Sequence, residues 1–275
     1  MSLQGARRRQ TGIGLKTYAI AYLAFLYVPV ALLPLFSFND SVFIAFPLSG
    51  FTTKWYAAMA ADDAMHAALL NTLKVGAVAA LSSTILGLLA AKALSRGALP
   101  GRSLLLGFAN LPLFIPEIVL GIALLMLMAA TRIPLSLVSV IIGHLVICLP
   151  FAVAVLLARL EGFDVSLEEA SRDLGEDAWM TFWRVTFPLA LPGIVSSLLL
   201  TFLVSFDDFM IAFFLCGTDT TLPVYIFGEL RFPNKLPGIL ALGATILIAS
   251  GVLVLVAEWV RHIGTPHAKR TAFAR

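Results

Sequence analysis

The chain has 275 residues, of which 60% are hydrophobic and only 13% are charged, and its mean hydropathy is +0.95. Soluble domains carry roughly 25% charged residues, so this composition excludes a water-exposed globular fold and indicates an integral membrane protein. The formal net charge of +3 reflects Lys and Arg beside apolar segments, which gives no basis for a nucleic-acid partner.

Six apolar segments are long enough to cross a bilayer, because a hydrocarbon core about 30 Å thick needs roughly 20 apolar residues in a helix. They cover residues 18–37, 69–91, 104–129, 137–158, 191–215 and 237–259. No small-residue cleavage site follows the first segment, so we expect it to be retained rather than removed as a signal peptide.

We therefore predict an all-α, polytopic membrane protein with six transmembrane helices. A basic N-terminus (1–17) precedes a transmembrane domain over 18–260, and a short basic tail (261–275) follows it. With the N-terminus in the cytoplasm, 14 Lys and Arg residues lie on the inner side and five on the outer side. This positive-inside bias predicts that both termini are cytoplasmic.

The loop between the fourth and fifth predicted spans, residues 161–190, is unusually polar and faces the cytoplasm in this orientation. Ser166 and Glu169 have the spacing of a capping box, which predicts a short helix over 167–174. Gly175 is expected to end that helix, because glycine supplies the left-handed conformation of a C-terminal cap.

A second short helix is expected over residues 177–185 of the same loop, ending before Pro188 because proline breaks a helix. The loop is rich in Asp and Glu, and anionic lipid headgroups would repel such a face. We therefore favour docking onto another protein over the alternative of an amphipathic hairpin that lies on the lipid.

Six residues of this loop carry a family resemblance. A Glu-Ala-small triplet, a glycine four positions on and a closing aliphatic-x-x-Pro resemble the EAA loop of ABC importer permeases. The matching residues are Glu169, Ala170, Ser171, Gly175, Val185 and Pro188. In that family the loop is a coupling helix seated in a groove of a cytoplasmic ATPase, so the resemblance implies an ATPase-coupling role for these residues.

The chain also resembles, along most of its length, the permeases of spermidine/putrescine importers. The similar segments include Leu26–Pro29, Lys54–Tyr56, Pro116–Glu117 and Ser205–Phe209. The resemblance implies a type I importer permease in the bacterial inner (plasma) membrane that carries out ATP-driven import of polyamine from periplasm to cytoplasm. The implied partners are the lipid bilayer, a second homologous permease, a cytoplasmic ABC ATPase dimer and a periplasmic solute-binding protein.

Related permeases share these features and carry other solutes. An opine, an amino-acid derivative or ferric ion is therefore an alternative cargo for the same architecture, and a passive channel is a further alternative.

Ionisable residues inside the predicted spans are the candidates for the substrate path. Glu117, Asp207 and Asp208 lie in apolar segments, where a carboxylate costs about 2.5–3.5 kcal/mol on the insertion scale. With His144 and Lys74 they would form one polar layer of net negative charge, which favours a cationic solute. The alternative is structural: an aspartate pairs with Lys74 or with the second permease of a dimer, Glu117 binds amides freed by the preceding proline, and His144 bridges two helices.

Several motifs are absent from the sequence. It contains no G-x-x-x-x-G-K-[ST] phosphate loop, so ATP hydrolysis is assigned to a separate chain. It contains neither G-x-S-x-G nor H-E-x-x-H, so we expect no enzyme activity. The four histidines show no metal-ligand spacing, so we expect no metal site or cofactor. Cys148 and Cys216 are expected to be buried free thiols.

Overall fold

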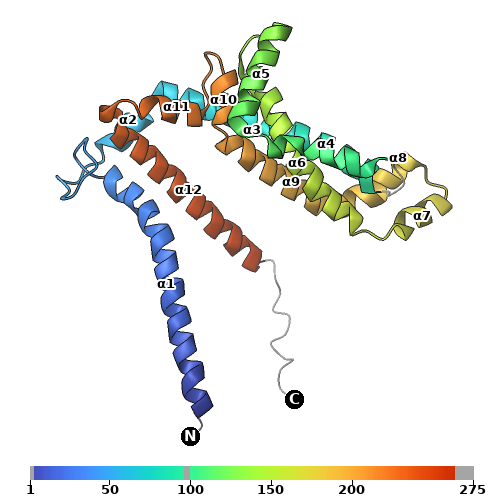
Figure 1. Ribbon diagram of the computed structural model, residues 1–275, viewed down its shortest axis with the longest axis horizontal. Coiled ribbons are helices and arrows are strands. Elements are labelled where there is room, and N and C mark those ends of the chain that lie inside the picture. Colours follow the sequence, from blue (N-terminus) through green and yellow to red (C-terminus); the bar gives the residue numbers. More distant parts are fainter. Residues whose placement is uncertain (1–2, 96–99, 264–275) are drawn as a thin grey trace. The chain divides into compact units, whose positions relative to one another are not determined.

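The computed structural model describes residues 3–95 and 100–263, and every named element in these ranges is a helix (Figure 1). The expected all-α fold is confirmed. The chain forms two compact units: Asp63–Phe227 makes one, and the segments on either side of it make the other.

The unit made by the two ends of the chain is built on contacts of α12 with α1 and with α2. The segment after α1 is held by side chains: the Tyr56 hydroxyl lies 2.7 Å from Ser37 Oγ, and Trp55 Nε1 donates to the Asn39 carbonyl. The elements of this unit are α1 (Leu3–Ser37), α2 (Lys54–Ala60), the 3-10 turn η2 (Pro233–Lys235) and α12 (Leu236–Ile263).

The unit Asp63–Phe227 contains the loop and the intramembrane acids singled out above. Figure 1 shows α7 and α8 at one end of α6 and α9, with α5 and α10 at the other end. Its elements are α3 (Asp63–Ser95), α4 (Arg102–Phe114), α5 (Glu117–Thr131), α6 (Leu137–Glu161), α7 (Ser166–Asp173), α8 (Ala178–Thr181), the π-helical turn η1 (Phe182–Thr186), α9 (Phe187–Asp207), α10 (Met210–Leu215) and the start of α11 (Leu222–Glu229).

Within the described residues, five helices are long and apolar enough to cross a membrane, or six if the bent pair α4–α5 counts as one span. The predicted third span, 104–129, is not one straight helix, because α4 and α5 are bent by 101°. Ile115 lies at the break with extended backbone (φ −89°, ψ 127°). Pro116 follows Ile115, and a residue that precedes a proline rarely adopts the helical conformation because it would clash with the proline ring.

The fifth span also differs from its expected bounds of 191–215. Its helical region begins at Ala178 and ends at Asp207, and Pro188 does not end the helix that starts at α8. The turn η1 precedes the proline, and the Phe187 amide bonds to the Phe182 carbonyl five residues earlier. This π turn adds a residue just before the proline, and it carries the helix past a site where a proline would ordinarily interrupt it.

Small residues let α3, α6 and α9 approach closely. Gly87 of α3 lies against the backbone of Ala152 in α6, and the Thr84 and Ser197 hydroxyls form a buried 3.0 Å hydrogen bond between α3 and α9. Small side chains and interhelical hydrogen bonds replace the hydrophobic effect as the means of helix association in lipid.

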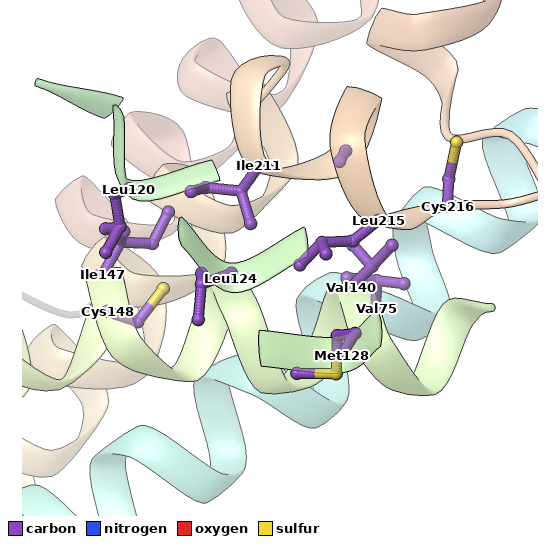
Figure 2. Close-up of a cluster of buried hydrophobic side chains, with 11 residues drawn as sticks. Val75, Leu120, Leu124, Met128, Val140, Ile147, Cys148, Ile211, Leu215 and Cys216 are labelled. Atoms are coloured by element: carbon purple, nitrogen blue, oxygen red, sulfur yellow. The ribbon is translucent and has the colours of Figure 1, made fainter. Parts of the chain in front are cut away.

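Two apolar clusters fill this unit. The cluster in Figure 2 joins α3, α5, α6 and α10, and includes Val75, Leu124, Val140 and Leu215. The second cluster joins α3, α6 and α9 nearer to α7, and comprises Ala91, Leu94, Val153, Leu156, Leu157, Leu160, Ala190 and Ile194. Both cysteines are buried and free, as expected.

The close contact of α3 with α6 gives a first prediction. A Cβ at Gly87 would lie 2.7 Å from the Ala152 Cβ, so Gly87→Val should destabilise the chain by about 1–3 kcal/mol through overpacking. Gly107→Val is the control, because no described atom lies within 4 Å of a Cβ there. Thermal unfolding in detergent should show a lower Tm for Gly87→Val than for Gly107→Val, and equal values would contradict the packing described.

Candidate functional site

A cavity of about 730 Å³ brings together the three acids predicted from the sequence. Its lining comes from α4, α5, α6, α9 and the breaks between α4 and α5 and between α9 and α10. Glu117, Asp207 and Asp208 all line it, and no Lys, Arg or His is among the lining residues. The three acids thus share one cavity, whereas His144 and Lys74, the other members of the expected polar layer, are not among its lining residues.

Asp208 is held by neighbouring groups. It follows the last residue of α9 with extended backbone (φ −67°, ψ 127°), and its Oδ2 accepts the amide of Ala212, 3.0 Å away in α10. A carboxylate that accepts an amide of the next helix satisfies backbone that the helix break would leave unpaired.

His144 lies behind Asp208 and is almost fully buried. Its Nδ1 is 2.6 Å from Ser205 Oγ, and its Nε2 is 3.1 Å from Asp208 Oδ2; the two side chains are 1% and 3% exposed. Nε2 is within ion-pair distance of the Asp208 carboxylate, but the ring nitrogen does not point at the oxygen closely enough for a hydrogen bond. His144 thus bridges α6 and α9 and also orients an acid of the cavity.

Glu117 and Asp207 are exposed to the cavity, in contrast to Asp208. In the described part of the chain, neither carboxylate has a hydrogen-bond or ion-pair partner, and Lys74 pairs with neither aspartate. The Pro116 carbonyl accepts the amides of Val119 and Leu120, so Glu117 does not serve the backbone there. The two structural alternatives for Lys74 and Glu117 are therefore wrong.

The polar loop is folded at the opposite end of the same unit. Lys92 at the end of α3 and Arg102 at the start of α4 pair with Glu168 and Glu161 respectively, which brings the ends of α3, α4 and α6 together with α7. These are the segments that the distribution of basic residues assigned to one side of the membrane.

The first helix of the loop is confirmed, but its capping box is wrong. α7 has no side-chain cap of the expected kind. Asp164 Oδ1 instead accepts the Ser166 amide at 3.0 Å. That bond holds the pKa of Asp164 below its ordinary value, so the carboxylate is charged at neutral pH and loses this interaction only as the pH falls through its lowered pKa. Both Ser and Asp commonly cap helices. Here the path of the backbone places the Asp164 carboxylate, rather than the Ser166 hydroxyl, beside a free amide.

The turn after α7 is a Schellman motif with Gly175 in the left-handed region (φ +93°). The Gly175 amide bonds to the Arg172 carbonyl, and the Glu176 amide bonds to the Ser171 carbonyl. The Ser171 hydroxyl, which is buried, lies 3.2 Å from Thr181 Oγ1 in α8. The expected glycine turn is therefore present and holds α7 against α8.

The remaining coupling candidates differ in exposure. Glu169, Ala170 and Pro188 are exposed, whereas Val185 is half-buried. Leu174 beside the glycine is 87% exposed and Trp179 is 66% exposed. The loop therefore presents apolar side chains outward in a region that is otherwise charged.

Sequence reasoning missed the residues that hold this loop to the spans. Glu168, next to the chosen Glu169, contacts Lys92 and Thr186. Ser205, the partner of His144, was also missed. Two adjacent glutamates on a short helix are equivalent in sequence, so only tertiary contacts distinguish them.

These features define a class of protein. A multi-pass membrane transport component has these three features: apolar helices of membrane-spanning length, an acidic cavity between them and a folded loop at one end.

Residues 83–269 match the family described as binding-protein-dependent transport system inner membrane component, and the chain belongs to that family. It is a multi-pass inner-membrane permease subunit of an ABC importer and not an enzyme. A binding-protein-dependent importer of this kind works with an ATPase and a solute-binding protein.

The chain is similar to several curated proteins of Escherichia coli. It is 32% identical to the spermidine/putrescine transport system permease protein PotC of strain K12, over 88% of this chain and 92% of that one. It is 35% identical to the putrescine transport system permease protein PotI, over 86% of each. It is 30% identical to the molybdenum transport system permease protein ModB, over 77% of this chain and 100% of that one.

A solved structure shares the fold. The crystal structure of a bacterial ABC transporter involved in the import of the acidic polysaccharide alginate superposes with a TM-score of 0.71. The match covers 96% of this chain and 99% of that chain at 18% identity, and it supports the architecture alone.

The His144–Asp208 contact gives a second prediction. His144→Ala leaves a buried carboxylate without its neighbour, which should cost about 3 kcal/mol of stability. Asp208→Asn combined with His144→Ala should cost less than the sum of the two single changes, because the unpaired charge is gone. Thermal unfolding of the four proteins in detergent measures this coupling, and strict additivity would show that the two side chains do not interact.

Proposed function

We propose that this chain is one permease of an ATP-driven importer that moves spermidine or putrescine from the periplasm to the cytoplasm. The observation that carries the proposal is the cavity with three carboxylates and no basic residue among its lining residues. The identity to two polyamine permeases supports the same cargo.

An extended polycation suits this cavity. Glu117 and Asp207 are free to pair with ammonium groups, and two unit charges 4 Å apart attract by about 4 kcal/mol at an effective dielectric constant of 20. Phe151, Phe209 and Met210 also line the cavity and provide apolar surface for the methylene groups between the amines. Asp208 already faces His144. It therefore adds to the negative electrostatic potential of the cavity more than it contacts the cargo directly.

Ferric ion fits less well. A metal ion needs three or more ligands that converge on one point, and no group of three His, Cys, Asp or Glu side chains in the described residues has that arrangement. A polyamine has separated charges and is suited to separated carboxylates.

In the proposed complex, residues 18–260 pair with a second homologous permease, and both termini are cytoplasmic. An ATPase dimer receives α7, with Glu169, Ala170 and the exposed Leu174 on the contact surface. Exposed apolar side chains beside charges are what a protein interface requires and a water-facing loop does not. Closure of the ATPases on ATP then moves the loop and opens the cavity to the binding protein.

The cargo assignment gives a third prediction. Glu117→Gln and Asp207→Asn should each raise the KM for polyamine uptake about tenfold, or about 1.4 kcal/mol, because each removes one charge partner. Asp63→Asn, at the start of α3 and outside the cavity lining, is the control and should leave the KM unchanged.

Uptake by the reconstituted complex with its binding protein is the measurement. Spermidine, putrescine, an opine and ferric ion should each be tried as competitors of labelled putrescine. Failure of spermidine and unlabelled putrescine to compete would overturn the cargo assignment.

The glycine turn gives a fourth prediction. Gly175→Pro should abolish ATP-driven uptake and leave the chain in the membrane, because proline cannot adopt φ +93°. Gly175→Asn is the matched variant, since asparagine tolerates the left-handed region, and it should keep most of the uptake. Normal transport by Gly175→Pro would count against coupling through this loop.

A further inference from the structure

Three polar side chains from three elements meet at the base of α7. Lys92 Nζ lies 2.7 Å from Glu168 Oε1 and 3.1 Å from Thr186 Oγ1, and the Thr186 hydroxyl donates to the same Glu168 oxygen at 2.8 Å. Lys92 belongs to the last turn of α3, Glu168 to α7, and Thr186 to η1 immediately before α9. We call these three residues the joint.

We propose that the joint is the connection through which movement of α7 reaches the membrane spans, with Glu168 as its positioning residue. This inference rests on the proposed coupling role of the loop and names a residue for it other than those of the EAA pattern. The exposed Glu169 and Ala170 would be moved by the ATPase, and the inward-facing Glu168 would pass that movement on.

Burial separates the joint from an ordinary surface ion pair. The side chains of Glu168 and Lys92 are 12% and 26% exposed, and Thr186 is 1% exposed. The Arg184–Glu176 pair of the same loop is 63% and 28% exposed. Exposed pairs contribute little because solvent screens them, whereas a partly buried, charge-assisted triangle fixes the relative positions of its three elements.

The geometry connects the joint to the acidic cavity. Thr186 directly precedes α9, whose 21 residues run to Asp207 at the cavity. At 1.5 Å per residue this helix is a rod of about 30 Å. Lys92 attaches the same point to α3, which packs along α6 and α9. A displacement of Glu168 is therefore delivered to two packed spans at once, and one of them ends at a carboxylate of the cargo path.

The other attachment of α7 leads to α9 alone, through α8 and η1, and does not include α3. Ser171 binds Thr181 of α8, which holds the two short helices of the loop to each other. Without the joint, α7 and α8 would still form one folded piece that can dock on an ATPase and that continues through η1 into α9, but α7 would lose its attachment to α3. The expected defect is therefore uncoupling rather than loss of assembly.

A charge swap tests the proposal. Lys92→Glu and Glu168→Lys should each lower the uptake per ATP hydrolysed at least tenfold, because each places like charges 2.7 Å apart in the native geometry. The double variant Lys92→Glu/Glu168→Lys restores opposite charges and should recover the ratio to within about threefold. Lys16→Met, which removes one exposed lysine of the other compact unit, is the control and should be unaffected.

Uptake, ATP hydrolysis and co-purification of the ATPase should be measured on the complete reconstituted complex. Glu168→Gln keeps the shape of the side chain and removes its charge, so it serves where a reversed charge prevents folding. It should co-purify with the ATPase and hydrolyse ATP with the uptake ratio reduced at least threefold.

Two outcomes separate the inference from the function on which it rests. If the unaltered complex shows no ATP-dependent uptake, the proposed function fails. If the unaltered complex transports and Glu168→Gln keeps a normal uptake per ATP hydrolysed, the joint is not the connection. The same conclusion follows if the single charge variants assemble and the double variant does not recover uptake per ATP hydrolysed.

Discussion

The structure depends on one constraint of the bilayer: backbone and polar groups at membrane depth must be satisfied by the protein itself. The unit Asp63–Phe227 contains two helix breaks, at Ile115–Pro116 and at Asp208–Phe209. At the first, the Pro116 carbonyl accepts amides of α5; at the second, the Asp208 carboxylate accepts an amide of α10. Both breaks line the acidic cavity, which is where irregular backbone is tolerated.

The same constraint explains the different states of the acids. Asp208 is enclosed, so it needs both an amide and His144, whereas Asp207 and Glu117 open into the cavity and need no protein partner. An unpaired carboxylate at such a site is costly in lipid and is useful only if a cation or water reaches it. The free acids form the open acidic surface of the cavity, and the enclosed one holds the break in shape.

Hydropathy locates the apolar segments, because a stretch of about 20 apolar residues has few alternatives, but it does not give the bounds of the fifth helix. Gly175 is predictable as a turn because few residues adopt a positive φ. The 101° bend at Pro116 was not predictable from composition, since proline kinks or breaks a helix by an amount that its packing sets. The cap of α7 was assigned to Ser166 although Asp164 makes the bond, and Glu168 and Glu169 were indistinguishable until α3 placed Lys92 beside one of them. The local path of the backbone settles the first choice, and a tertiary contact settles the second.

The π turn at Phe182–Thr186 also sets the direction in which the later side chains of the same helix point around its axis. One residue more or fewer in a helix turns all later side chains by about 100° around the axis. The face of α9 that carries Asp207 to the cavity, rather than to lipid, is therefore determined at the far end of the same helix, roughly 30 Å away. A single added residue beside the loop therefore decides which side chains of α9 face the acidic cavity.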